Sequence, residues 1–185
     1  MLLNPRARFD LAESLRTVGA PIRDVYSFIS GLYFRGKVAY SDAFACPPSG
    51  VPSAVVITPG AGLIPVDTVI TAEQLRALAA IDINEDEPRY REPLERDARL
   101  LAEAAGPECQ FILLGSIATA KYMAPLLDCL GDRLVFPRDF VGRGDMSRGG
   151  LMLRCARDGV ELQYVPAKGA VRRGARPPKL PKPKR

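Results

Sequence analysis

The sequence predicts an α/β protein, a three-layer sandwich in which helices cover both faces of a mainly parallel sheet of about four strands. Short apolar runs typical of buried strands alternate with stretches of helical periodicity along the chain of 185 residues. The content of 47% hydrophobic and 25% charged residues is that of an ordinary globular domain. This length favours one domain with a substantial core, which we place at residues 1–167.

The N-terminal part of this domain, residues 1–45, is expected to be helical because its apolar positions recur at helical spacing. Tyr26, Tyr33 and Tyr40 are seven residues apart and would share one face of an unbroken helix. With Arg35 and Lys37 nearby, that face could stack nucleic-acid bases. Packing in the core is the more common role of half-buried tyrosines.

Four apolar runs are expected to form the sheet, and helical patterns separate them. The runs are residues 54–58, 111–114, 134–136 and 160–165. The expected helices between them are residues 72–80, 93–105 and 118–130 and a helix capped by Asp145 or Ser147, with Gly149 and Gly150 in its first turn. Thr71 and Gln74 form a capping-box signature for the first of these helices. Strands and helices in this alternation favour parallel pairing.

Polar, glycine-bearing loops follow three of these strands, at Thr58–Thr68, Gly115–Lys121 and Pro137–Arg148. In a parallel sheet such loops meet at one edge, where ligands usually bind. The residues expected to bind a ligand or a phosphate are Thr58, Gly60, Gly62, Gly115, Ser116, Lys121, Arg143, Gly144, Ser147 and Arg148.

The third loop makes the strongest case for an anion site. Arg143 and Arg148 bracket the start of a helix, whose free N–H groups and dipole attract negative charge. Two guanidinium groups would add forked donors that suit a phosphate. The alternative is a flexible surface turn with solvated arginines.

The titratable residues exclude several chemistries. The chain has no histidine, and its four cysteines lie far apart, so we expect no structural zinc and no imidazole base. Magnesium held by carboxylates is the alternative, but no spacing of acids favours it, and we expect no metal. The glycines do not form the dinucleotide-binding fingerprint, and we expect no cofactor. Asp67 and Asp145 are the acids nearest the expected site and could act as a base or orient water. Capping a helix or closing a turn is an equally good role for each.

The net charge of +5 comes from the C-terminal residues 168–185. They hold eight of the 26 lysines and arginines and no acid, which leaves 18 basic against 21 acidic residues in 1–167. Four prolines and few large apolar side chains predict a disordered or extended arm that neutralises phosphates of nucleic acid. Its expected contacts are Arg172, Arg173, Arg176, Lys179, Lys182 and Lys184. A solubilising terminus, or a tether for a protein partner, is the alternative.

No apolar run is long enough to span a membrane, and the first residues lack the apolar core of a secretory signal. We therefore expect a cytoplasmic protein without a membrane partner.

Two stretches resemble known families. LLGSIATAKY at Leu113–Tyr122, with the following helix, strand LVFP and polar loop, resembles the second half of the uracil-DNA glycosylase-like fold. TPGAGLIPVDTVIT at Thr58–Thr71 resembles the central α/β domain of archaeosine synthase and of related uncharacterised bacterial domains linked to modified guanines. The resemblance covers residues 50–165 and implies work on nucleic-acid bases. The aspartate-bearing and histidine-bearing loops of the glycosylases are replaced by TPGAG and FPRDFVGRGDMSRGG, so their usual chemistry is not implied.

Together, these features predict a protein that binds nucleic acid or a nucleotide and takes part in base modification or repair. An enzyme acting on a small phosphorylated metabolite through the same loops is one alternative. A non-catalytic module that binds a protein through its C-terminal arm is the other.

Overall fold

The computed structural model describes residues 1–178 and Leu180, so the predicted contacts Lys179, Lys182 and Lys184 lie outside the described residues. Within these residues the helices are α1 (Asp10–Thr17), α2 (Ile22–Ser30), α3 (Leu32–Phe44), α4 (Ala72–Ala79), α5 (Pro88–Ala104), α6 (Ala120–Leu130) and α7 (Asp145–Asp158), with short 3-10 turns at Gly131–Arg133 and Arg138–Phe140. The strands are β1 (Ala20–Pro21), β2 (Val55–Thr58), β3 (Gly62–Pro65), β4 (Val69–Ile70), β5 (Phe111–Ile112), β6 (Leu134–Pro137) and β7 (Tyr164–Pro166).

The predicted parallel sheet of about four strands is wrong, and with it the glycosylase-like three-layer fold. The described strands form three small sheets, β1–β4, β2–β3 and β5–β6–β7. Both two-stranded sheets are antiparallel, and β6 pairs antiparallel with β7. Only β5 and β6, joined through α6, run parallel.

The physical reason for the largest error lies in the turn after β2. Gly60 and Gly62 adopt positive φ angles of 77° and 66°, a conformation that glycine reaches without strain. The chain therefore reverses at once, and Thr58 pairs with Gly62 in a tight hairpin. The expected ligand loop is thus a β-turn followed by a strand, and no helix crosses over from β2 to a parallel neighbour.

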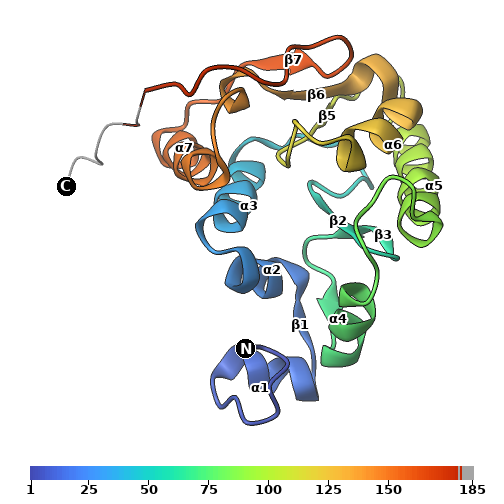
Figure 1. Ribbon diagram of the computed structural model, residues 1–185, viewed down its shortest axis with the longest axis vertical. Coiled ribbons are helices and arrows are strands. Elements are labelled where there is room, and N and C mark those ends of the chain that lie inside the picture. The colour runs from blue at the N-terminus through green and yellow to red at the C-terminus, as the bar shows by residue number, and fades with distance from the viewer. Residues whose placement is uncertain (179, 181–185) are drawn as a thin grey trace.

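The elements are arranged around two apolar cores. Helices α3 and α7 lie side by side, α5 and α6 lie side by side, and β5–β7 connect the two pairs at one end of the molecule (Figure 1). The larger core fills this region, whereas α1, α2, α4 and β1 enclose a smaller core at the N-terminal end. Helix α3 joins the two, because Tyr33 and Tyr40 pack in the larger core and Phe34 packs in the smaller one.

The local signals for helices were more reliable than those for strands. The capping box at α4 is confirmed, since the Thr71 hydroxyl accepts from Gln74 N at 3.3 Å and the Gln74 side chain accepts from Thr71 N at 2.8 Å. Helix α5 begins at Pro88, five residues before the expected start at residue 93, with Glu87 as its N-cap. Gly31, with φ 56°, divides the helical pattern of residues 22–44 into α2 and α3.

Helix α7 packs on α3 through two glycines. A Cβ atom at Gly149 would lie 2.7 Å from the carbonyl oxygen of Leu32, and one at Gly36 would lie 2.6 Å from the carbonyl oxygen of Gly149. The two backbones therefore touch at this crossing. Gly149 weakens the helix in isolation, but it permits the packing that positions the loop before α7.

Among the described residues, no helix combines the length and the apolar character needed to cross a bilayer.

Candidate functional site

Two of the three predicted loops, Gly115–Lys121 and Pro137–Arg148, lie close together. The Tyr33 hydroxyl on α3 donates to the carbonyl oxygen of Leu114 at 3.2 Å, just before the first loop. Burial raises the pKa of Tyr33 above its ordinary value, and the neighbouring Arg148 guanidinium of the second loop opposes this rise. Tyr33 thus links the two loops from inside the molecule.

The C-terminal segment links the same loops from outside. Arg173 Nη2 donates to the carbonyl oxygen of Ala118 at 3.4 Å. Its neighbour Ala175 lies against the second loop, where a Cβ atom at Gly142 would be 2.1 Å from the Ala175 carbonyl oxygen. The basic arm therefore begins with a turn at Lys168 and Gly169 and continues over residues 170–178, without helix or strand, across the loops.

The remaining predicted loop, Thr58–Thr68, lies elsewhere, against α5. The buried Thr58 hydroxyl donates to the carbonyl oxygen of Gly62 at 3.0 Å and closes the hairpin. A Cβ atom at Gly62 would meet Asp97 of α5 at 2.0 Å, and one at Gly60 would meet Ile81 at 2.2 Å. These residues are used for packing within the chain, and the structure does not bring them to the other two loops.

The two acids expected at the site belong to different groups of contacts. Asp67 is exposed, and its Oδ1 lies 3.3 Å from Arg23 Nη1. The same arginine also forms an ion pair with Asp42, at 2.6 Å. Asp145 lies in the first turn of α7, with its Oδ1 3.8 Å from Arg148 Nη1. Only Asp145 therefore lies at the paired loops.

The two arginines of the α7 loop also differ. Arg148 is buried, and its Nε and Nη2 atoms donate to the carbonyl oxygen of Phe140 at 3.3 and 3.0 Å. Arg143 is half-buried and donates to the carbonyl oxygen of Asp139 at 3.0 Å and to Ser147 Oγ at 3.3 Å. Arg148 therefore holds the loop in shape, whereas Arg143 lies nearer the solvent.

The remaining predicted residues line the edges of these loops. Gly144 is the exposed N-cap residue of α7. Ser116 Oγ, next to the half-buried Gly115, accepts from the Thr119 hydroxyl at 3.3 Å. The backbone carbonyl of Lys121 accepts from Tyr90 at 2.9 Å, and its ammonium nitrogen lies 5.2 Å from the centre of the Tyr122 ring.

Tyrosine side chains surround one lysine beside the paired loops. We call Tyr26, Tyr33, Lys37 and Tyr122 the tyrosine–lysine cluster. Lys37 Nζ lies 4.1 Å from the centre of the Tyr33 ring, within the range of a cation–π contact. Tyr122 of α6 acts on the pKa of both Tyr26 and Tyr33, which places all three phenols near one another. The seven-residue spacing indicated Tyr26, Tyr33 and Tyr40 on one helix, but Gly31 divides that helix and Tyr40 instead contacts the Tyr164 hydroxyl at 2.7 Å. Tyr122 had no such signal.

Burial controls the charge of Lys37. It lowers the pKa of Lys37 from 10.5 to about 8, while Asp145 raises this pKa and Arg148 lowers it further. Lys37 forms no ion pair with a carboxylate in the described part of the chain. The cation–π contact favours the charged form by about 0.5–1 kcal/mol, which is less than one pKa unit at about 1.4 kcal/mol each. The contact therefore offsets only part of the effect of burial.

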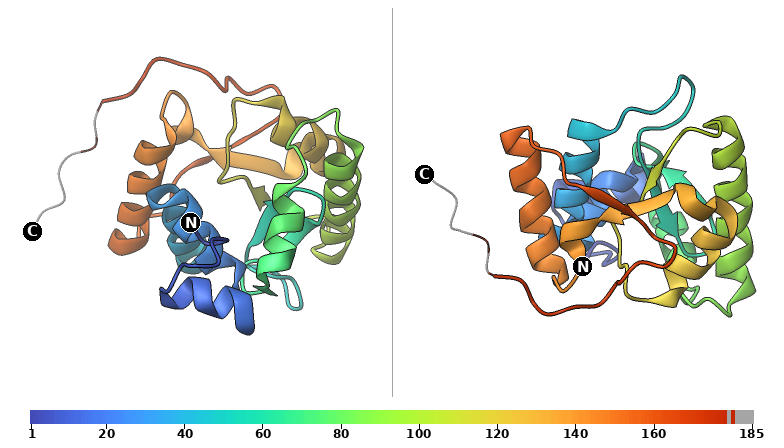
Figure 2. Two further views of the ribbon diagram at one scale, coloured as in Figure 1. Left: turned by 60° about the horizontal axis from the view of Figure 1, so that its bottom comes forward. Right: turned by 90° about the horizontal axis from the view of Figure 1, so that it is seen from above.

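A shallow groove of about 500 Å³ lies where β7 leads into the C-terminal segment. Both cations and valines line it. Its lining is Arg138, Val141, Val165, Pro166, Lys168, Gly169, Ala170 and Val171. In both views of Figure 2 the chain continues from β7 past α7. We call the cations along this path the basic C-terminal face, which consists of Arg138, Lys168, Arg172, Arg173 and Arg176.

Most cations of the basic C-terminal face lack a carboxylate partner. Lys168 Nζ lies 3.3 Å from Asp132 Oδ1, and both side chains are exposed. None of the four arginines forms an ion pair with another described residue. The sequence indicated Arg172, Arg173 and Arg176 but missed Arg138, whose position directly after a strand was its only signal.

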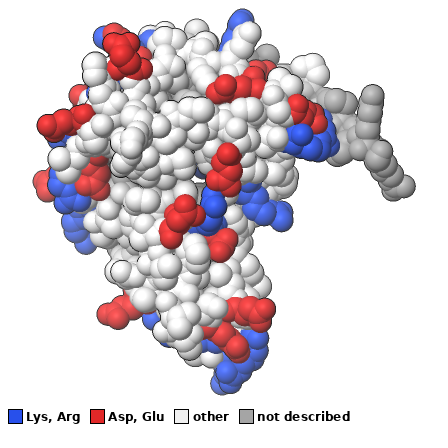
Figure 3. Space-filling model, turned by 180° about the vertical axis from the view of Figure 1, so that it is seen from behind, with Lys and Arg blue, Asp and Glu red and all other residues white. Residues whose placement is uncertain are grey.

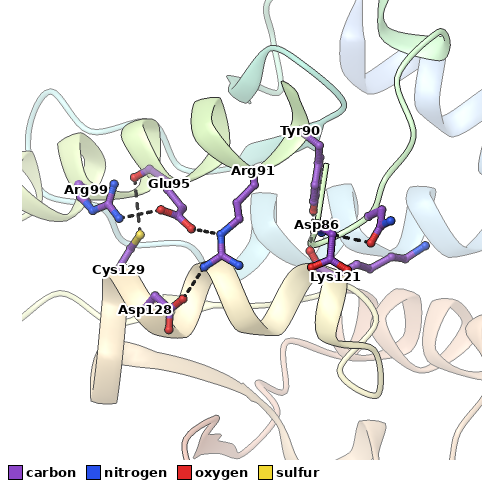
Figure 4. A network of polar contacts seen from close by, with 9 residues as sticks. Asp86, Tyr90, Arg91, Glu95, Arg99, Lys121, Asp128 and Cys129 are labelled. Atoms are coloured by element: carbon purple, nitrogen blue, oxygen red, sulfur yellow. Dashed lines mark hydrogen bonds and ion pairs between the residues drawn. The ribbon is translucent and has the colours of Figure 1, made fainter. Parts of the chain in front are cut away.

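A second set of arginines, on α5, is fully paired (Figure 4). Glu95 binds both Arg91 and Arg99, and Arg91 continues to Asp128 of α6 at 2.8 Å. We call these four residues the α5–α6 ion network. Partial burial raises the pKa of Glu95, but hydrogen bonds from Arg99 and Arg91 outweigh it and hold the pKa below its ordinary value. Acidic and basic side chains are also intermixed over the face drawn in Figure 3.

Comparisons with protein-family models, with curated proteins and with solved structures find no match for this chain.

Proposed function

We propose that the protein binds nucleic acid along its basic C-terminal face. The observation that carries this proposal is the groove between Arg138 and Lys168, which continues into an extended segment of arginines without carboxylate partners. The four arginines of this face remain available to an external anion, because no carboxylate of the described residues pairs with them.

The geometry fits a polyanion better than a single small anion. An extended chain advances at most about 3.3–3.6 Å per residue, so Arg173 and Arg176 stand no more than roughly 11 Å apart along it. Side chains at this spacing reach different phosphates of one strand. Each phosphate neutralised releases counterions, which makes binding strongly dependent on salt.

The apolar lining of the groove adds a surface for the less polar parts of a nucleotide. Val141, Val165 and Val171 line the groove together with its cations, and Val171 is largely exposed. Phosphate contacts position a nucleic acid without reading its sequence, and these apolar side chains offer no hydrogen bonds to base edges. We therefore propose binding with little sequence preference.

The test is a titration of the full chain with single-stranded DNA, double-stranded DNA and RNA over a series of salt concentrations. Replacing Arg172, Arg173 and Arg176 together by glutamine should reduce the slope of log K against log salt by about 3. The matched control replaces Arg89, Arg96 and Arg157, which are exposed and already paired with carboxylates.

Both triple variants lose the same net charge, so only the location of the cations differs between them. The proposal predicts that the control retains the slope of the wild-type protein. Equal losses in the two variants, or no binding of any nucleic acid at low salt, would show that the basic C-terminal face is not the binding surface.

A further inference from the structure

We infer that the nucleic acid bound along the basic C-terminal face is a single strand, whose unpaired bases pack against the valines of the groove. This inference rests on the proposed function and names the form of its ligand. Two observations carry it: the groove is lined by apolar and cationic side chains together, and the segment that follows it is packed on the body of the protein.

Two glycines face each other where residues 170–178 cross the loop before α7. A Cβ atom at Gly142 would lie 2.1 Å from the carbonyl oxygen of Ala175 and 3.1 Å from that of Gly174. A Cβ atom at Gly174 would in turn lie 3.0 Å from Val141 Cγ1. The segment therefore packs directly on the loop. This contact holds Val171, which comes just before the crossing, in the lining of the groove.

The apolar cores leave valine side chains accessible in this groove. Val171 is 77% exposed, and Val165 is only half-buried. A singly exposed valine is ordinary on a protein surface. Here, however, the valines share one groove with Arg138, which forms no ion pair with another described residue. A ligand in the groove therefore meets apolar and positively charged groups at the same time.

A single strand matches this combination better than a duplex does. The base faces of a duplex are stacked inside it, and its outside presents phosphates, sugars and the polar edges of the bases. In a single strand the base faces are accessible, so side chains can pack on them while cations contact the backbone. Charge alone would favour the duplex, which carries one negative charge per about 1.7 Å of its axis. A preference for the single strand would therefore measure the apolar part of the groove.

The test compares the affinity of the full chain for one DNA strand with its affinity for the same strand annealed to its complement. Both are measured by fluorescence anisotropy at the same low salt concentration. We expect the single strand to bind roughly tenfold more tightly. Equal affinities, or tighter binding of the duplex, would overturn the inference.

Val171 allows two opposite changes at one exposed position, where neither substitution disturbs a core. Val171→Asn removes apolar surface without changing the charge, so affinity for the single strand should fall about threefold. Val171→Phe supplies a ring on which a base can stack, so this affinity should rise about fivefold. Affinity for the duplex and the dependence on salt should stay unchanged in both variants. Changes of equal size for the single strand and the duplex would overturn the inference.

Val18 is the matched control, because it is 79% exposed and carries the same side chain. It lies at the C-cap of α1, at the opposite end of the molecule from β7 (Figure 1). Val18→Asn and Val18→Phe should leave both affinities unchanged. If Val18→Phe raised affinity for the single strand as much as Val171→Phe does, the added ring would act without regard to the groove, and the inference would be wrong.

The same measurements separate failure of this inference from failure of the proposed function. If neither the strand nor the duplex binds at low salt, both are wrong. If the duplex binds as tightly as the strand, and replacing Arg172, Arg173 and Arg176 still reduces the salt dependence, the basic C-terminal face remains the binding surface. Only the inference of a single strand then fails.

Discussion

The basic C-terminal face and the α5–α6 ion network are both rich in arginine, but they hold their charge in different ways. On α5, Glu95 alone accepts from two guanidinium groups, and a carboxylate of α6 extends the network. Along the C-terminal face, Arg172, Arg173 and Arg176 have no carboxylate partner among the described residues. The two regions differ in the location of their counter-charges and not in the count of their cations, and this difference is the basis for proposing the C-terminal face as the binding surface.

The largest expected effect comes from a substitution at the close crossing of α3 and α7, beside the C-terminal face. In Gly149→Ala the new methyl group would meet the backbone of Leu32 and Tyr33 at 2.7–2.8 Å. We expect a loss of about 3 kcal/mol in the free energy of unfolding, measured by urea denaturation.

Gly150 is the matched control for this substitution. A Cβ atom there would meet only Leu180, at an ordinary distance of 3.8 Å. Gly150→Ala should therefore stabilise α7 by up to about 1 kcal/mol. Equal losses at Gly149 and Gly150 would contradict the close crossing of α3 and α7.

A smaller effect is expected from the arginine that shapes the loop before α7. Arg148→Ala removes both donors to the carbonyl oxygen of Phe140, which should cost about 2 kcal/mol of stability. Arg143→Ala, on the solvent side of the same loop, should cost about 0.5 kcal/mol. Thermal or urea unfolding of the two variants measures the difference. A larger loss at Arg143 would reverse the roles that we give to the two arginines.

The stability of the hairpin after β2 can be compared in the same way with that of the loop before α7. Thr58→Val removes the buried hydroxyl that donates to the carbonyl oxygen of Gly62, at a cost of about 1 kcal/mol. Because this hairpin lies against α5, nucleic-acid binding should remain unchanged. Loss of binding in a folded Thr58→Val protein would bring the hairpin back into the binding site.

The smallest effect is expected in the α5–α6 ion network, and it depends on pH. The pKa of Glu95 is lower in the folded protein than its ordinary value of 4.5, so its contribution is present above that value and is lost as the pH falls through the folded pKa. Glu95→Gln should cost about 0.5 kcal/mol at pH 7 and less at pH 2. Urea unfolding at both pH values tests this, and a difference that is undiminished at pH 2 would assign the loss to packing.

Local signals in the sequence were sufficient for most helices. The capping box of Thr71 and Gln74 begins α4 where the sequence predicted, and Gly159 ends α7 in the left-handed conformation. Such signals act within a few residues, so they can be recognised without knowledge of the fold.

The pairing of the strands could not be predicted in the same way. Strand β5 has two residues and β7 has three, so their partners are decided by long-range packing rather than by their own pattern. Glycines such as Gly60 were interpreted as a ligand loop, although their positive φ angles serve a hairpin turn.

The candidate site likewise contains residues that the local sequence identified and residues whose role depends on long-range packing. The charge pattern of the C-terminal residues identified Arg172, Arg173 and Arg176 from the sequence alone. The burial of Arg148 depends on the position of Phe140, which is separated from it by eight residues and a turn of the chain. The depressed pKa of Lys37 depends on packing between helices distant in the sequence.

The measurement that most directly tests the proposed binding surface is photochemical cross-linking of the full chain to oligonucleotides that carry 4-thiouridine or 4-thiothymidine, with the linked peptides identified by mass spectrometry. We predict cross-links in residues 138–143 and 165–178, which form the groove and the extended segment. Cross-links confined to α5 and α6, where the cations are already paired, would contradict the account.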